Sequence, residues 1–204
     1  MGITGTDVAK EASDLIITDD NFSTIVSAVE EGKIIYTNLT SAIKYLLASN
    51  LSEVLMVFTA MLIGLPLPLS PLAILWLNMA TDGLPALALA VDSHDGHFVH
   101  HFKKSGFTSN FLDTHDLRYI LTTGLTIAVL ALSAFWISLP RLGLANARLF
   151  TFTILVIMQL SVAFLVRRSA RKIFANKILL AAVAAALISQ AVILVVPFFR
   201  NRYI

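Results

Sequence analysis

The sequence predicts an all-α, multi-pass membrane protein with about five transmembrane helices and a small α/β segment at its N-terminus. Hydrophobic residues make up 57% of its 204 residues and charged residues only 14%, and the mean hydropathy is +0.80. A water-soluble domain needs roughly a quarter of its residues charged to cover its surface. Much of this protein's surface must therefore face lipid.

Five apolar stretches are long enough, or nearly so, to cross a hydrocarbon core of about 30 Å, which takes roughly 20 helical residues. They comprise residues 45–65, 73–91, 119–139, 149–166 and 178–196. Pro66, Pro68 and Pro71 stand between the first two stretches. Because proline interrupts a helix, we expect these two spans to form a tight hairpin.

The basic residues predict the orientation of the chain in the membrane. If the N-terminus is cytoplasmic, eleven of the fifteen Lys and Arg residues fall on or near the cytoplasmic side, as the positive-inside rule requires. These are Lys10, Lys33, Lys44, Lys103, Lys104, Arg118, Arg167, Arg168, Arg171, Lys172 and Lys177, against Arg141, Arg148, Arg200 and Arg202 outside. Five spans then leave the C-terminus on the exterior side. The net charge of +2 is too small to indicate a nucleic-acid partner, and the chain has no cysteine.

The first 35 residues differ from the rest. Residues 14–18, Asp-Leu-Ile-Ile-Thr, predict a short buried strand, and residues 22–33 carry apolar side chains at helical spacing. One strand and one or two helices cannot enclose a hydrophobic core. We therefore expect residues 1–35 to be the cytosolic remnant of a larger α/β domain and residues 36–204 to form the membrane domain. The second helix either ends at Gly32 or runs unbroken into the membrane.

Polar side chains interrupt the apolar spans in three places. Those of the first two spans recur at intervals of three or four residues, so each group shares one helix face. The candidates are Asn50 and Glu53 in the first span, Asn78, Thr81 and Asp82 in the second, and Gln159 in the fourth. A carboxylate at the bilayer centre costs on the order of 3 kcal/mol, so it persists only with a function or a partner.

The chemistry of these side chains indicates a site for a hard cation. They offer carboxylate, amide and hydroxyl oxygens, which are the ligands of calcium, magnesium and sodium. Gly83 and Pro85 directly follow Asp82 and should loosen the helix there, which would free backbone carbonyls as further ligands. The alternative is that the polar groups only bond one helix to another. For Gln159 alone that alternative is the better interpretation.

Several segments resemble the P-type cation ATPases. Residues 1–14, Leu-Ile-Ile-Thr-Asp-Asp-Asn-Phe at 15–22 and Val-Glu-Glu-Gly-Lys at 29–33 are similar to the end of their phosphorylation domain. Asn50 with Glu53, and Asn-Met-Ala-Thr-Asp-Gly-Leu-Pro at 78–85, resemble the fifth and sixth transmembrane helices of the calcium-pump branch. The resemblance is specific as far as Asp92 and only architectural beyond it.

This resemblance implies that Asn50, Glu53, Asn78, Thr81 and Asp82 ligate the transported cation. Calcium is the expected ion, with magnesium, manganese and sodium as alternatives. Gln159 falls where those pumps carry a glutamate, so an amide replaces one carboxylate and the number of cation sites is left open. The expected partners are the lipid bilayer and the N-terminal half of the pump.

The phosphorylation motif of the family, Asp-Lys-Thr-Gly-Thr, and its nucleotide-binding lysine do not occur in the sequence. We therefore expect ATP and Mg²⁺ to act only in an intact pump. One alternative is a partner chain that completes a split pump or acts as a passive ion-binding subunit. The other alternative is a truncated gene product. All five histidines lie between residues 92 and 116, where a solvated loop is the better interpretation and a metal-sensing loop the alternative.

Overall fold

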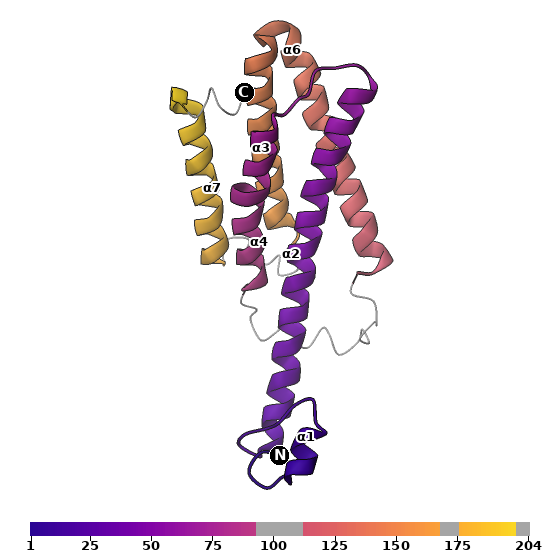
Figure 1. The fold of residues 1–204 in the computed structure, drawn as a ribbon, viewed down its shortest axis with the longest axis vertical. Helices are drawn as coiled ribbons and strands as arrows, with labels where there is room; N and C mark the ends of the chain where they lie inside the picture. Colours follow the sequence, from indigo (N-terminus) through magenta and orange to yellow (C-terminus); the bar gives the residue numbers. More distant parts are fainter. Residues whose placement is uncertain (93–111, 168–175, 199–204) are drawn as a thin grey trace.

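The computed structural model describes residues 1–92, 112–167 and 176–198, and the only regular secondary structure in these ranges is helical (Figure 1). Its elements are α1 (Asp7–Glu11), α2 (Phe22–Leu62), α3 (Pro71–Trp76), the π-helix η1 (Leu77–Asp82), α4 (Gly83–Ala90), α6 (Thr114–Leu165) and α7 (Lys177–Val195). Four helices within these residues are long and apolar enough to cross a membrane: α2, the continuous segment Pro71–Ala90, α6 and α7. The prediction of helices long and apolar enough to cross a membrane is therefore confirmed.

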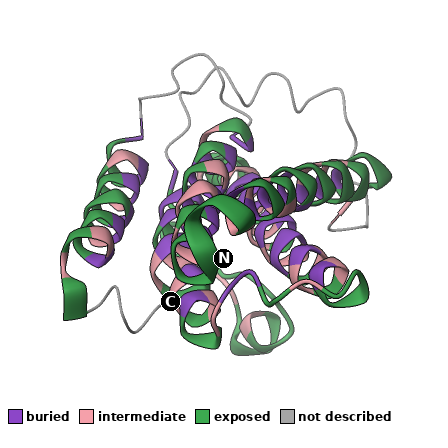
Figure 2. Cartoon of the chain, turned by 90° about the horizontal axis from the view of Figure 1, so that it is seen from above, coloured by how far each residue is buried: buried purple, intermediate pink, exposed green. Residues whose placement is uncertain are grey.

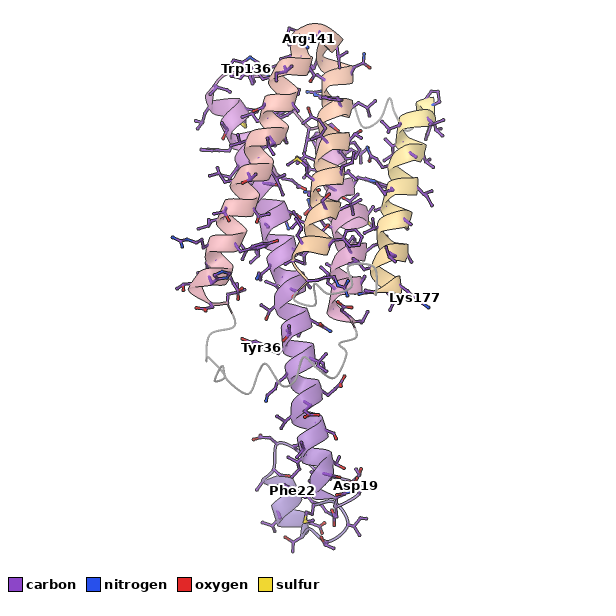
Figure 3. All side chains as sticks on the ribbon, turned by 180° about the vertical axis from the view of Figure 1, so that it is seen from behind. Asp19, Phe22, Tyr36, Trp136, Arg141 and Lys177 are labelled. Atoms are coloured by element: carbon purple, nitrogen blue, oxygen red, sulfur yellow. The ribbon has the colours of Figure 1, made fainter. Side chains whose placement is uncertain are left out.

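Helix α6 turns back on itself and contains two of the five predicted spans. It has 52 residues, and a straight helix of that length would extend about 78 Å, far beyond the hydrocarbon core. Gly143 breaks it with φ 73° and ψ 167°, a conformation that favours glycine, shortly after Pro140. Figures 1 and 3 show the turn at the upper end of the molecule, beside Arg141. We call residues 114–142 the first arm and residues 144–165 the second arm.

Helix α2 resolves the question that the sequence left open at Gly32. It begins after the Asn21 side chain, which accepts a hydrogen bond from the Ser23 backbone, and runs without a break through Gly32 to Leu62. Its 41 residues correspond to about 60 Å. Burial starts at Thr37, so the N-terminal third of α2 projects below the bundle, as Figure 1 shows and as Tyr36 marks in Figure 3.

The strand predicted at residues 14–18 is wrong. The structure describes these residues and gives them no strand, and no strand occurs elsewhere in the described ranges. Ile17 accepts one backbone hydrogen bond, from Gly2 N at 2.7 Å, which is a single contact rather than a ladder. A strand is stabilised by pairing along its length, and the described residues supply no neighbouring strand for this segment.

The core of the bundle lies along α2. This helix packs chiefly against both α6 and α4, and α7 packs against α4. Figure 2 shows buried residues on the inward faces of the helices and exposed residues around the outside. Gly124 of the first arm lies close against α2. A Cβ atom at this position would lie 3.1 Å from the carbonyl oxygen of Ala48 and 3.0 Å from the Leu51 side chain.

Hydrogen bonds and a buried ion pair join α2, near the point where it enters the bundle, to the lower ends of α4, α6 and α7. Arg167, just past the end of α6, binds Asp92 through Nε at 2.7 Å and Nη2 at 3.1 Å. Asn38 of α2 donates to the backbone oxygen of Asp92 at 2.6 Å. Asn176, which caps α7, donates to the Ala88 carbonyl of α4 at 3.0 Å. These contacts hold α2, α4, α6 and α7 in register at one end.

A second buried ion pair joins α2 to the first arm. Lys44 Nζ lies 2.7 Å from Asp116 Oδ1 and 4.8 Å from the centre of the Tyr119 ring. Lys44, counted above among the charges on the cytoplasmic side, is therefore enclosed between two helices. At the opposite end, Arg148 Nε donates to the Leu67 carbonyl at 2.9 Å and so ties the second arm to the loop after α2.

We expect Gly124→Val to destabilise the bundle, because even a Cβ atom at this position is crowded by the backbone of α2. Overpacking of this kind lowers the free energy of unfolding by about 1–3 kcal/mol. Thermal unfolding in detergent measures the effect. Gly32→Val is the matched control, since nothing lies within 4 Å of a Cβ there, and its effect should stay within about 0.5 kcal/mol. Equal stability of the two variants would contradict the packing described here.

Asp20 organises the N-terminal loop, and its ionisation can be measured. Its carboxylate accepts hydrogen bonds from the Thr4 hydroxyl at 2.6 Å, Thr4 N at 2.7 Å and Ile3 N at 3.2 Å. The hydroxyl bond from Thr4 is the main reason that its pKa is lowered to about 2. Because the pKa is lowered, the stabilisation of the loop is complete above the ordinary value of 3.8 and is lost as the pH falls through about 2.

An NMR titration of the Asp20 carboxyl carbon should give an apparent pKa of about 2 in the parent chain. Thr4→Val should raise this pKa toward 3.8, because it removes the hydroxyl donor and preserves the shape. Thr4→Ser keeps the hydroxyl and should restore the low value. A pKa that does not respond to Thr4→Val would exclude this hydrogen bond as the cause.

Candidate cation-binding site

Glu53 lies where three helical segments meet inside the bundle. Its side chain is buried, at 4% exposure, in the middle of the membrane part of α2. Asn78 of η1 donates to Glu53 Oε2 at 3.1 Å, and Gln159 of the second arm donates to Glu53 Oε1 at 2.9 Å. The structure therefore brings together three of the residues predicted from sequence, one from each segment.

Asp82 lies at the end of η1 and is fully buried. The hydroxyl of Tyr45 lies 3.1 Å from Asp82 Oδ1 and 3.2 Å from the carbonyl oxygen of Thr81. The other carboxylate oxygen of Asp82, Oδ2, has no hydrogen-bond partner among the described residues. A buried carboxylate oxygen without a donor is costly, so this atom is a strong candidate for binding a cation.

The π-helical segment has a local cause in the sequence. Pro85 has no N–H, so it cannot donate to the carbonyl of Thr81 four residues earlier, and its ring crowds that carbonyl. The helix widens here into η1, which ends at Asp82, and Tyr45 approaches the Thr81 oxygen that proline leaves without its helical donor. The predicted loosening after Asp82 thus takes the form of a π-helix that starts at Leu77, before the Gly-Leu-Pro motif.

Two other predicted ligands, Thr81 and Asn50, are less directly connected to Glu53 and Asp82. Thr81 is fully buried, but its hydroxyl donates to the Leu77 carbonyl at 2.7 Å. Asn50 is partly buried, and its amide donates to Leu46 of its own helix at 2.9 Å. No hydrogen bond in the described part of the chain joins Asn50 to the other candidates. It would have to change its side-chain rotamer to contribute an oxygen.

Tyr45 belongs to the site and is absent from the sequence-based candidates. It is completely buried and contacts both Thr81 and Asp82. The sequence held one relevant signal: Tyr45 precedes Glu53 by eight residues, so both lie on one face of α2. An aromatic residue at that spacing is typical of any helix core. Only the contact with Asp82 distinguishes Tyr45 from an ordinary core residue.

The chemistry available at the site is that of oxygen ligands around two carboxylates. Gln159 Oε1 and Ser49 Oγ are also buried without a hydrogen-bond partner in the described ranges. Asn78 and Gln159 both present N–H groups to Glu53, and an amide that rotates by half a turn presents its oxygen instead. The same side chains can thus stabilise a bare carboxylate and ligate a cation.

The described residues hold no group of three or more His, Cys, Asp or Glu side chains that could bind a metal ion. Calcium, however, accepts neutral amide and carbonyl oxygens together with carboxylates. The candidate site has two carboxylates and relies on neutral oxygens for the remaining ligands. The four histidines at 94, 97, 100 and 101, considered above for metal sensing, lie outside the described residues.

Comparison with known proteins identifies the family of this chain. Residues 66–202 match the family model described as "Cation transporting ATPase, C-terminus". The "Calcium-transporting ATPase" of Bacillus subtilis is 42% identical over 204 aligned residues, which cover 97% of this chain and 23% of that relative. "Calcium-transporting ATPase 1" of Saccharomyces cerevisiae is 36% identical, with 100% of this chain and 22% of the relative covered.

A third relative shows where the similarity is concentrated. "Calcium-transporting ATPase 2, endoplasmic reticulum-type" of Arabidopsis thaliana is 53% identical over 95 residues, which cover 47% of this chain and 9% of the relative. The chain spans less than a quarter of the length of each of these three proteins. The matched family model and the two long alignments establish that this chain belongs to the P-type cation-transporting ATPases and corresponds to their C-terminal membrane region.

Proposed function

We propose that this chain supplies the cation-binding part of an ATP-driven calcium transporter. In this proposal Glu53 and Asp82 provide the charge, and Asn50, Asn78, Thr81 and Gln159 provide neutral oxygens. Residues 1–35 would be the end of the phosphorylation domain, and residues 36–204 the membrane domain. ATP hydrolysis and its Mg²⁺ would be contributed by the parts of the pump that precede this region in its relatives.

The main support is that two carboxylates, Glu53 and Asp82, are buried on the neighbouring elements α2 and η1. Glu53 is held by amides from two other segments, while Asp82 keeps one buried oxygen without a donor in the described part of the chain. Two acidic side chains buried close to the middle of an apolar bundle are expensive unless a positive charge compensates them. A transported cation would supply that charge during part of the cycle.

The preference for calcium has two supports. The relatives described above are named calcium-transporting ATPases, from bacteria, yeast and plants. The site offers oxygens only, and calcium tolerates the irregular geometry that mixed amide, carbonyl and carboxylate ligands impose. Magnesium requires near-ideal octahedral geometry and gives up its water reluctantly, so it fits this ligand set less well.

The proposed orientation places the lower end of the bundle in the cytoplasm. The N-terminus, the start of α6 and the start of α7 lie at this end in Figure 1, and the α6 turn and the loop after α2 lie at the other. Five spans that start from a cytoplasmic N-terminus require the same division between the two ends. The excess of Lys and Arg in the sequence at residues 103–118 and 167–177 supports a cytoplasmic location for this end.

We expect Asp82→Asn to impair calcium binding and transport more than any neutral substitution in the site. The change keeps the size of the side chain and removes its charge, which should weaken affinity by on the order of tenfold or more. The test measures ⁴⁵Ca²⁺ uptake into vesicles by this chain fused to the N-terminal portion of the Bacillus subtilis relative. Thr81→Ala and Gln159→Ala should retain more activity than Asp82→Asn.

Asp113→Asn is the matched control, because it removes a carboxylate from the exposed start of α6 and retains a side chain that can cap the helix. It should transport like the parent protein. Parent-like transport by Asp82→Asn, together with loss of transport in Gln159→Ala, would refute the assigned roles. Calcium binding by the purified chain should be weak, because the amides of Asn50, Asn78 and Gln159 would have to rotate before their oxygens could join the six to eight that calcium takes.

The orientation can be tested with single cysteines, because the chain has no native cysteine. A cysteine at Arg141 should react with a membrane-impermeant maleimide in intact cells. A cysteine at Ser27, on the exposed part of α2, should react only after permeabilisation. The reverse pattern would show that the lower end of the bundle faces the exterior.

A further inference from the structure

The two arms of α6 enclose a groove that is separate from the cation site. Its volume is about 360 Å³, and buried Ile127 and Val162 form its floor. The residues at its rim are exposed and come from both arms: Thr122 and Thr126 from the first, and Ile157, Ser161 and Leu165 from the second. From Ile157 to Leu165 the groove extends about 12 Å along the bundle axis.

Three of the four hydroxyl groups that line the groove already donate hydrogen bonds to backbone carbonyls. Thr122 donates to the Arg118 carbonyl at 2.8 Å, Thr126 donates to the Thr122 carbonyl at 2.7 Å, and Ser161 donates to the Ile157 carbonyl at 2.7 Å. These hydroxyl protons are therefore engaged within their own helices. The wall of the groove consists mainly of methyl and methylene groups and suits an aliphatic occupant.

The position of the groove along the membrane follows from the first arm. Arg118 and Trp136 are 18 residues apart on this arm, or about 27 Å, close to the thickness of the hydrocarbon core. Arginine and tryptophan are typical of the two membrane interfaces. The groove begins one helical turn beyond Arg118 and continues toward the bilayer centre, so it lies in the acyl-chain region of one leaflet.

Arg118 provides charge complementarity at the mouth of the groove. It is exposed and forms no ion pair with any described residue. The nearest acidic residues on its helix have other roles: Asp113 caps the helix, and Asp116 pairs with Lys44. A guanidinium at the headgroup level, one helical turn from an apolar groove, matches a phospholipid, whose phosphate and acyl chains are joined through glycerol.

We propose that this groove binds one phospholipid, with an acyl chain between the arms of α6 and the phosphate on Arg118. A transmembrane helix fits the groove less well, because a helix is 10–12 Å across and packs along a seam as long as the bilayer is thick. This inference does not depend on the identity of the transported cation. It requires only that both arms of α6 span the membrane.

The test measures lipid retention by the purified 204-residue chain in detergent, using native mass spectrometry. The probes are phosphatidylglycerol with palmitoyl and oleoyl chains and the diacylglycerol with the same chains, which lacks the phosphate. The parent chain should retain phosphatidylglycerol about fivefold better than diacylglycerol. Arg118→Gln should remove this preference and leave diacylglycerol retention unchanged, whereas Arg141→Gln, at the α6 turn, should behave like the parent.

A second variant tests the groove itself. Ser161→Phe should fill it and reduce retention of both probes at least about fivefold. Leu121→Phe adds an aromatic ring to an exposed position outside the groove and should have no effect. Parent-like retention by Ser161→Phe would overturn the proposal. In a separate experiment in the membrane, a benzophenone side chain at position 157 should crosslink to lipid. Crosslinking to protein instead would also overturn the proposal.

Discussion

The carboxylate of Glu53 is the point on which the arrangement of the bundle depends. A carboxyl group buried in an apolar interior requires hydrogen-bond partners, and here the donors come from two segments that are 25 and 106 residues away in sequence. Satisfying this one group fixes the positions of η1 and the second arm relative to α2. The charge that a cation would neutralise therefore also serves as a structural link among three helices.

The second constraint is backbone geometry around Pro85. A proline within a membrane helix leaves one carbonyl without its usual donor, and in lipid that carbonyl has no water to bind. The chain meets this requirement with a π-helix and a tyrosine hydroxyl from α2. Because that hydroxyl also contacts Asp82, the helix irregularity and the candidate site are parts of a single local structure.

Much of this architecture could be predicted from sequence because its signals are local. Long apolar stretches predict membrane helices regardless of their partners, and the spacing of Asn50, Glu53, Asn78 and Asp82 assigns each residue to a helix face. The contact between Asp92 and Arg167 could not be predicted, since it joins positions 75 residues apart. The strand at residues 14–18 was predicted from composition alone, but strand formation requires a neighbour to pair with. The ligand roles of the six candidate residues stay a prediction.

The unbroken course of α2 has a mechanical consequence. Glu53 lies 31 residues after Phe22, or about 46 Å along a single helix without a proline or other break. The interactions of Asn38 and Lys44 lie between the projecting part of this helix and the carboxylate. The same continuous helix therefore connects the segment below the bundle to Glu53, with no hinge between them.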